Sequence, residues 1–425
     1  MKSNELLRKI LAISAFFVVF AIPTESQAVS MYARQTGQAC ASCHFQHYPL
    51  LNDYGRAFKA GGYTQIGKEG TVEGENLSIP ETLNIGMVAK IRFQKTNGPA
   101  VTSVTGVHGM NDGRWDIPDE LSVLIGGRIN KNIGFFLEGA TVEGPFLGGF
   151  KIPFTYDVGP VKVGVVPFST GELGASFGFE LLNTGAVKNQ RMAEQGADIS
   201  AQQYVVGPHA ARGAAFVVSN PLFFVNLTKW SPGHVGEYQS SPEATYFRAA
   251  VTPRVGDWDL AAGVQSWSGS AEVLTNGIDP PVSVNDTKAM AVDAQAQGKI
   301  GAIPLGIYLS YAKANATSAT GTINYFNVTP GNNERNAAAV AVEIGVLPRK
   351  ATVILAYRKA DNGELTYNGD NAVTVGGTYQ IVQNMQLQLT HAMRSGSAYD
   401  AGSPNMSLPN GTGDRHTTLL LFGSF

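Results

Sequence analysis

The chain has 425 residues, of which 44% are hydrophobic and only 15% are charged, and its formal net charge is -2. This balance gives no reason to expect nucleic acid or a polybasic contact with a membrane surface. The low charged fraction is unusual for a soluble surface and suits a chain whose outside partly meets lipid.

The first thirty residues have the layout of a secretory signal peptide. Lys2, Arg8 and Lys9 precede the apolar run ILAISAFFVVFAI, which is too short to cross a bilayer comfortably. Ser26-Gln27-Ala28 has small residues at the right spacing for cleavage, although an uncleaved anchor is an alternative. We therefore expect a signal peptide over residues 1–28, an exported mature chain that starts near Val29, and no transmembrane helix after it.

Both cysteines of the chain lie in the stretch CASCHFQH, residues 40–47. Cys40, Cys43 and His44 match the pattern of c-type haem attachment. Two thiols three residues apart lie on one side of a helical turn, where each can add to a haem vinyl group, and the following imidazole can bind the iron. A redox disulfide would leave His44 without a role, and a zinc site would need further ligands nearby. We predict one covalently attached haem c with His44 as its proximal ligand.

The sixth ligand of the iron is left open by the sequence. On a continuous helix His47 would face the same side of the iron as His44, so we expect it to contact the haem edge or a propionate instead. Met87 belongs to the lipid-facing side of the first strand. The remaining candidates are Met31, His108 and Met110, and a vacant position is a further alternative.

The haem segment continues for only some thirty residues around the motif before strand patterns begin, which is too few for an independent hydrophobic core. We expect it to occupy residues 29–80 and to be enclosed by the rest of the chain. Arg34, Arg56 and Lys59 are candidates to neutralise haem propionates, although each is explained equally well as a solvated surface charge.

From about residue 81 the dominant period is two. In TLNIGMVAKIRFQ every second residue from Leu83 to Phe93 is apolar, whereas Lys90 and Arg92 lie on the opposite face. The same alternation recurs in FKIPFTYDV, MAVDAQAQGKI, IPLGIYLSYAK and NMQLQLTHAMR. Such strands fit between lipid and a watery lumen, although a soluble two-sheet sandwich has the same period.

Turn-forming clusters such as KTNGPA, NGIDPP and TPGNNE separate these strands, and some of the connections are short hairpin turns whereas others are long polar loops. Residues 183–203 are polar and lack the period of two, so they form either an external loop or a loop that folds into the barrel. The closing strand HTTLLLFGSF ends on Phe425, which resembles the assembly signal of bacterial outer-membrane barrels. We predict an all-β outer-membrane barrel of about 16 antiparallel strands over residues 81–425, preceded by a short α-helical haem segment.

The sequence resembles the outer-membrane fused cytochrome–porins of iron-oxidising bacteria. The residues that carry the resemblance are ARQTG at 33–37, CASCH at 40–44, Pro49 and YGRAFKAGGY at 54–63. The resemblance is specific in this segment and only architectural across the remaining three-quarters of the chain. It implies a single haem c in or at the mouth of the barrel, with Cys40 and Cys43 as the thioether residues and His44 as the proximal ligand.

The resemblance further implies an iron oxidase, which takes an electron from extracellular Fe(II) at the haem and passes it to a periplasmic cytochrome c or copper protein. The loop carboxylates considered for attracting iron are Asp112, Asp116, Asp119 and Glu120, although solvated loop charge explains them as well. Related haem-barrel proteins of metal-respiring bacteria share much of the N-terminal pattern. The alternatives are therefore an outward conduit to extracellular acceptors and a porin that the haem only gates.

Overall fold

The computed structural model describes residues 30–67, 69–99, 110–140, 146–188, 191–234, 240–274, 282–408 and 411–425. The predicted signal peptide over residues 1–28 lies outside this range. Among the described residues, no helix combines the length and the apolar character needed to cross a membrane.

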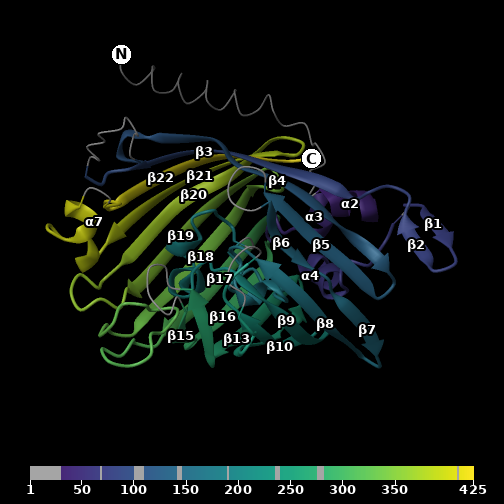
Figure 1. The fold of residues 1–425 in the computed structure, drawn as a ribbon. Coiled ribbons are helices and arrows are strands. Elements are labelled where there is room, and N and C mark those ends of the chain that lie inside the picture. The colour runs from purple at the N-terminus through teal and green to yellow at the C-terminus, as the bar shows by residue number, and fades with distance from the viewer. Residues whose placement is uncertain are drawn as a thin grey trace, which may run out of the picture.

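The chain begins with three short helices and a small hairpin. The helices are α2 (Ser30–Thr36), α3 (Cys40–Cys43) and α4 (Asp53–Ala60). The hairpin pairs β1 (Thr71–Gly74) with β2 (Leu77–Pro80) and projects from one end of the molecule (Figure 1).

The rest of the chain forms a closed antiparallel barrel. Its segments are, in chain order, β3 (Ile85–Thr96), β4 (Arg114–Asn130), β5 (Ile133–Ala140), β6 (Leu147–Lys151), β7 (Phe154–Val158), β8 (Val161–Thr170), β9 (Ala211–Asn220), β10 (Phe223–Ser231), β11 (Ala244–Val251), β12 (Arg254–Val255), β13 (Trp258–Ser268), β16 (Ala289–Ile300), β17 (Ile303–Ala314), β18 (Arg335–Leu347), β19 (Ala351–Asp361), β20 (Asn371–Val382), β21 (Met385–Ser395) and β22 (Arg415–Ser424). Segments pair with their neighbours in the chain, and β22 pairs with β3 to close the ring.

These segments make sixteen barrel strands, as the sequence predicts. Two strands are interrupted by a proline, which has no N–H for the ladder. Pro153 separates β6 from β7, and both segments pair with β5 and β8. Pro253 separates β11 from β12, and both pair with β13. The expected strand FKIPFTYDV is therefore β6 and β7 together.

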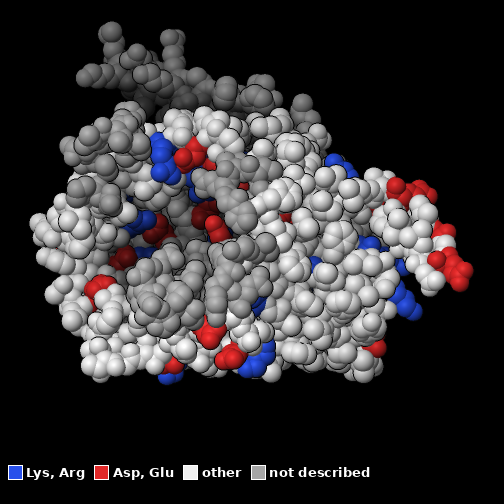
Figure 2. All heavy atoms as spheres, in the orientation of Figure 1, with Lys and Arg blue, Asp and Glu red and all other residues white. Residues whose placement is uncertain are grey.

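The alternation in the sequence corresponds to the two faces of the barrel. Lys90 and Arg92 of β3 point inward, because both form ion pairs with Glu194, which lies in the lumen. The outer face carries exposed apolar side chains, including Leu227, Val264, Leu309, Leu355 and Leu389. Figure 2 shows the same division, with an almost uncharged outer wall and charged side chains gathered in a hollow at one end. A closed ring with an apolar outside is the form in which strands can cross a bilayer, which supports an outer-membrane location.

The connections at the two ends of the barrel differ in length. At the end where β3 begins and β22 finishes, strands are joined by tight turns such as 131–132, 301–302 and 383–384. At the opposite end they are joined by longer loops that contain η1 (Met110–Asp112), η2 (Ala175–Phe177), α5 (Gly196–Ile199), α6 (Ala201–Val205), the hairpin of β14 (Ser270–Leu274) and β15 (Val282–Asp286), η4 (Ser397–Tyr399) and α7 (Pro404–Ser407). In outer-membrane barrels the short turns face the periplasm and the long loops face outside.

The lumen is occupied from both ends. The helical segment 30–67 contacts widely separated strands, including β13 through Arg56 and β22 through Tyr48. Residues 171–210, the loop between β8 and β9, fold inward from the other end, and the two segments meet where Leu51 and Asn183 exchange hydrogen bonds of 2.8 and 2.9 Å. Of the two arrangements left open by the sequence for residues 183–203, the inward one is observed.

Candidate functional site

The cysteine pair lies on a single helical turn. The His44 backbone N–H donates to the Cys40 carbonyl at 2.9 Å, which closes the turn of α3 and puts both thiols on one side of it. Cys40 is 5% exposed and Cys43 is partly exposed. Burial raises the pKa of the Cys43 thiol to about 11, so this sulfur is held in a shielded environment.

His44 has the ring orientation of a metal ligand. Its Nδ1 lies 3.1 Å from the Leu50 carbonyl oxygen, so an N–H at Nδ1 donates there and leaves a lone pair on Nε2. Burial lowers the pKa of His44 to about 4, and the ring is therefore neutral at physiological pH. A neutral imidazole with Nε2 available is the form that binds iron.

Helix α4, which follows the motif, packs so closely against α3 that its contact position, Gly55, has no space for a side chain. Asn52 caps α4 by accepting from the Gly55 N–H, and its side chain donates to the Ser42 carbonyl at 3.0 Å. A Cβ atom on Gly55 would lie 2.2 Å from the Cys43 carbonyl oxygen. This close approach explains the first glycine of YGRAFKAGGY, and it fixes α4 beside the attachment residues.

A cavity opens beside Cys43 and His44, with about 1010 Å³ of empty space that includes space open to solvent. It lies between the helical segment, the barrel wall and the inward loop. Its wall is mainly aromatic and aliphatic, with a few charged groups, and includes Tyr32, Tyr48, Phe58, Lys59, Tyr63, Phe136, Glu138, Lys151, Leu173, Phe177 and Val187. Cys40 borders a smaller adjoining cavity of about 420 Å³ that also reaches His44 and Tyr48. A flat, mostly apolar group with a polar edge suits a cavity with this lining.

His47 is engaged by the barrel wall, and its contact with the haem edge or a propionate stays a prediction. The helix ends at Cys43 and His44 is extended, so the two histidines do not share a helix. The Nε2 atom of His47 lies 2.5 Å from Glu343 Oε1 on β18, and both side chains are buried. His47 therefore attaches the helical segment to the barrel wall and is unavailable to the iron.

None of the described methionine candidates for the sixth ligand lines the main cavity. Met31 is fully buried against the barrel wall with Val88, Leu124, Leu420 and Phe422. Met87 lies on the outer side of β3, as expected. Met110 belongs to η1 in a loop at the opposite end of the barrel, and His108 lies outside the described residues.

The three candidate cations for the propionates have different positions. Arg34 donates to the Ile85 carbonyl at 2.5 Å, and Arg56 forms two hydrogen bonds with Asp259 on β13, at 2.6 and 2.7 Å. Both guanidinium groups thus hold the segment against the barrel. Of these three predicted cations, Lys59 alone lines the main cavity. A further lysine, Lys151 of β6, lines it as well. Sequence reasoning missed Lys151, whose one signal was its place on the polar side of a strand.

The acidic residues considered for iron attraction are mostly paired with basic ones. Asp119 binds Arg92 at 2.7 Å, Glu120 binds Lys90 at 2.7 Å, and Asp116 binds Arg114. Among the described residues, no group of three or more histidine, cysteine, aspartate or glutamate side chains has a metal-binding arrangement.

The inward loop covers the main cavity on its outer side. Leu173, Phe177 and Val187 contribute to the cavity wall. The loop is fixed by a buried ion-pair network, in which Arg248 of β11 contacts Glu180 at 3.0 Å and Asp293 of β16 at 2.5 Å. This arrangement separates the motif from the outer mouth of the barrel.

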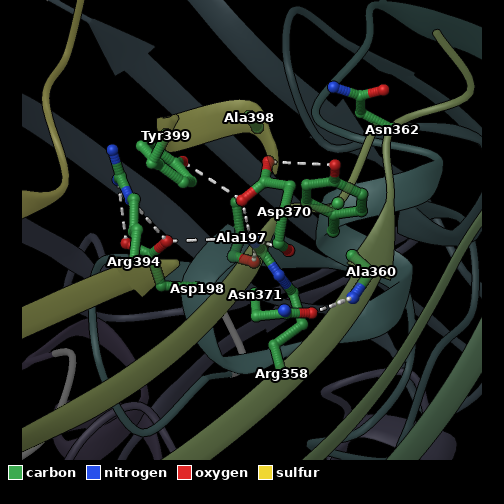
Figure 3. A network of polar contacts seen from close by, with 12 residues as sticks. Ala197, Asp198, Arg358, Ala360, Asn362, Asp370, Asn371, Arg394, Ala398 and Tyr399 are labelled. Atoms are coloured by element: carbon green, nitrogen blue, oxygen red, sulfur yellow. Dashed lines mark hydrogen bonds and ion pairs between the residues drawn. The ribbon is translucent and has the colours of Figure 1, made fainter. Parts of the chain in front are cut away.

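A polar vestibule of about 1180 Å³ lies on the other side of the same loop. There Asp198 accepts two hydrogen bonds from Arg394 of β21, at 3.1 and 3.0 Å, and Arg358 donates to the Ala197 carbonyl at 2.6 Å (Figure 3). Tyr399 donates to Asp370 at 3.1 Å in the same network. A second polar cavity of about 1190 Å³ has Asp198 and Arg394 in common with the vestibule, and Tyr48 and Pro49 in common with the main cavity.

Comparison with known proteins gives no family assignment, because no family model and no curated protein matches the chain. Solved structures that are similar include a loop-deletion mutant of OmpT from Vibrio cholerae, with a TM-score of 0.46 and 12% identity over 81% of this chain and 99% of that one. The outer-membrane channel DcaP of Acinetobacter baumannii has a TM-score of 0.45 and 12% identity over 81% of this chain and 97% of its own. OpdK of Pseudomonas aeruginosa has a TM-score of 0.39 and 11% identity over 80% and 98%. At these values the likenesses carry no argument about function.

Proposed function

We propose that the protein is an outer-membrane monohaem cytochrome whose barrel encloses its own redox site. The observation that carries this proposal is that Cys43 and His44 line a mostly apolar cavity inside the lumen, while the Nδ1 of His44 is engaged by the Leu50 carbonyl. The sequence CASCH provides the attachment residues, and the lining of the cavity suits the group that such a motif binds.

A bound haem c would supply one-electron transfer. The contributions of the protein are positional. Cys40 and Cys43 would hold the group and His44 would bind its iron, while the ion pairs of Arg56 and His47 fix the helical segment in the lumen. The inward loop and the aromatic wall limit the access of water, and burial in such an environment is one of the factors that set a haem potential.

On this proposal the electron donor is extracellular Fe(II), and the acceptor is a periplasmic cytochrome c or copper protein. The resemblance of the N-terminal segment to the cytochrome–porins supports this direction. The chemistry does so as well, because ferric iron precipitates near neutral pH and a cell gains by leaving the product outside. Iron oxidation would then need no substrate pocket of the usual kind.

The test adds Fe(II) to the purified protein and follows the haem α band. We expect the band to rise as the haem is reduced, and we expect His44→Ala to abolish the response while the barrel still folds. A haem that is present but unresponsive to Fe(II) would contradict iron oxidation. The measured haem potential then decides between inward and outward electron flow.

A second candidate function is a porin in which the haem segment only gates or senses. The polar cavities that adjoin one another from the vestibule to Tyr48 favour it, because they offer a route for small ions past the inward loop. This candidate predicts measurable ion conductance in planar bilayers together with a haem that Fe(II) does not reduce.

A further inference from the structure

Lys151 occupies an unusual environment for an ammonium group. It is the last residue of β6, its side chain points into the lumen, and only 4% of the residue is exposed. Its Nζ donates to the Phe177 carbonyl at 2.9 Å and lies 4.1 Å from the centre of the Phe177 ring. Among the described residues it forms no ion pair with a carboxylate.

A second lysine reaches the same cavity from a different part of the chain. Lys59 lies in the last turn of α4, so the two cations come from the haem segment and from the barrel wall. Burial lowers the pKa of Lys59 to about 8, which reflects incomplete solvation of its ammonium group. Glu138 is the one carboxylate among the described residues that line this cavity.

The position of Lys151 is costly unless an anion completes it. Removing an ammonium from water costs several kcal/mol even after relaxation, and one carbonyl with the Phe177 ring at 4.1 Å and two rings at 5.9 Å offsets only part of this cost. Two cations directed into one apolar space also repel each other. Buried ionisable groups inside a membrane protein are therefore functional candidates by default.

We propose that Lys151, together with Lys59, binds the carboxylates of the ligand that occupies the main cavity. The ligand class is a flat, largely apolar tetrapyrrole that carries carboxylate side chains. This inference rests on the proposed function, because the ligand is the haem attached at Cys40 and Cys43. It adds a role for two residues outside the attachment motif, namely to hold and neutralise the propionates.

A purely structural explanation of Lys151 makes a different prediction. If its role were only to hold the inward loop through the Phe177 carbonyl, any side chain that keeps a hydrogen-bond donor would be sufficient. Lys151→Gln keeps a donor and removes the charge, whereas Lys151→Arg keeps both. The two variants therefore separate the loop contact from the charge.

The experiment measures the haem midpoint potential of the full-length protein by spectroelectrochemical titration near neutral pH, where carboxyl groups are ionised and Lys59, with its pKa of about 8, keeps its charge. A nearby positive charge favours the reduced haem, which carries one positive charge fewer. We expect Lys151→Gln and Lys59→Met to lower the midpoint potential and Lys151→Arg to restore it. Lys162→Met is the matched control, since Lys162 pairs with exposed Asp157 outside the cavity.

The outcomes distinguish this inference from the proposed function. If the wild-type protein carries no covalent haem, both fail. If it carries haem but Lys151→Gln and Lys59→Met shift the potential no more than Lys162→Met, the inference is overturned and the proposed function stands. Lys59→Met takes the place of Lys151→Gln if that variant fails to fold, as judged by heat-modifiable migration in gel electrophoresis. Lys59 belongs to α4 and not to a barrel strand, so its substitution leaves the barrel wall unchanged.

Discussion

At the scale of single residues, the motif is explained by its neighbours as much as by its own chemistry. His44 owes its ligand geometry to the Leu50 carbonyl, and Gly55 allows α4 to lie against Cys43. His47, which the spacing alone makes a candidate for the haem environment, is engaged by Glu343. His47 and Glu343 are 296 positions apart along the chain, so no local pattern indicates the pair.

Substitution of Met31 tests the sixth position of the iron. Met31 is enclosed by Val88, Leu124, Leu420 and Phe422 and does not line the main cavity. We therefore expect Met31→Leu to leave the absorbance spectrum of the oxidised haem unchanged and to cost less than about 1.5 kcal/mol of stability, as for other volume-conserving core changes. A sulfur-to-iron charge-transfer band that is present in the wild type and lost in Met31→Leu would contradict this assignment.

At the scale of elements, the helical segment and the inward loop are held by charges that come from different strands. The strands themselves were predictable, because an apolar face alternating with a polar one leaves a local signal in each segment. The fold of residues 171–210 was not predictable, because its stabilising contacts are long-range. Glu194, for example, binds Lys90 and Arg92 about one hundred residues earlier in the chain.

The buried pair of His47 and Glu343 provides a test of how the helical segment is attached. Glu343→Leu removes one partner of a fully buried pair and should weaken the docking of residues 30–67 by about 3–5 kcal/mol. Native-state hydrogen exchange in this segment measures the loss. The double variant His47→Leu/Glu343→Leu should be closer to the wild type, since no unpaired charge remains. Equal loss in the single and double variants would contradict the argument that the unpaired partner causes the loss.

Docking of the inward loop should depend on pH through Glu194. Burial alone would raise the pKa of Glu194, but Lys90 and Arg92 outweigh burial and hold it at about 2, below its ordinary value of 4.5. The stabilisation is complete above about pH 4.5 and is lost as the pH falls towards 2. We expect faster hydrogen exchange in residues 191–205 near pH 3 than near pH 6, after correction for intrinsic rates. Glu194→Gln should be loosened already at the higher pH and show no further change in this window.

At the scale of the whole molecule, closure of the ring depends on the last residue. Phe425 and Met87 exchange backbone hydrogen bonds of 3.0 and 2.6 Å beside the β22–β3 ladder. The sequence predicted the terminal strand and its alternation. The pairing of this terminal strand, β22, with β3 could be inferred only from closure of the barrel, because no local pattern in β22 identifies β3.

Deletion of Phe425 should impair closure. The two lost hydrogen bonds are worth about 1 kcal/mol each, and the deletion also exposes the start of β3. We expect a lower yield of heat-modifiable barrel after refolding in detergent. Phe425→Leu keeps both backbone bonds and is expected to refold like the wild type. The hydrogen-bond argument would be wrong if the deletion refolded equally well.

The composite nature of the main cavity has a consequence for the order of biogenesis. Its walls come from the first helices, from β5 and β6, and from the inward loop, so the space is complete only when the strands are assembled around it. A rigid cofactor that is attached to Cys40 and Cys43 would have to pass between these walls if it arrived late. On the proposed function, maturation of the cysteines therefore precedes insertion of the strands, and a chain that inserts first is trapped in an inactive form.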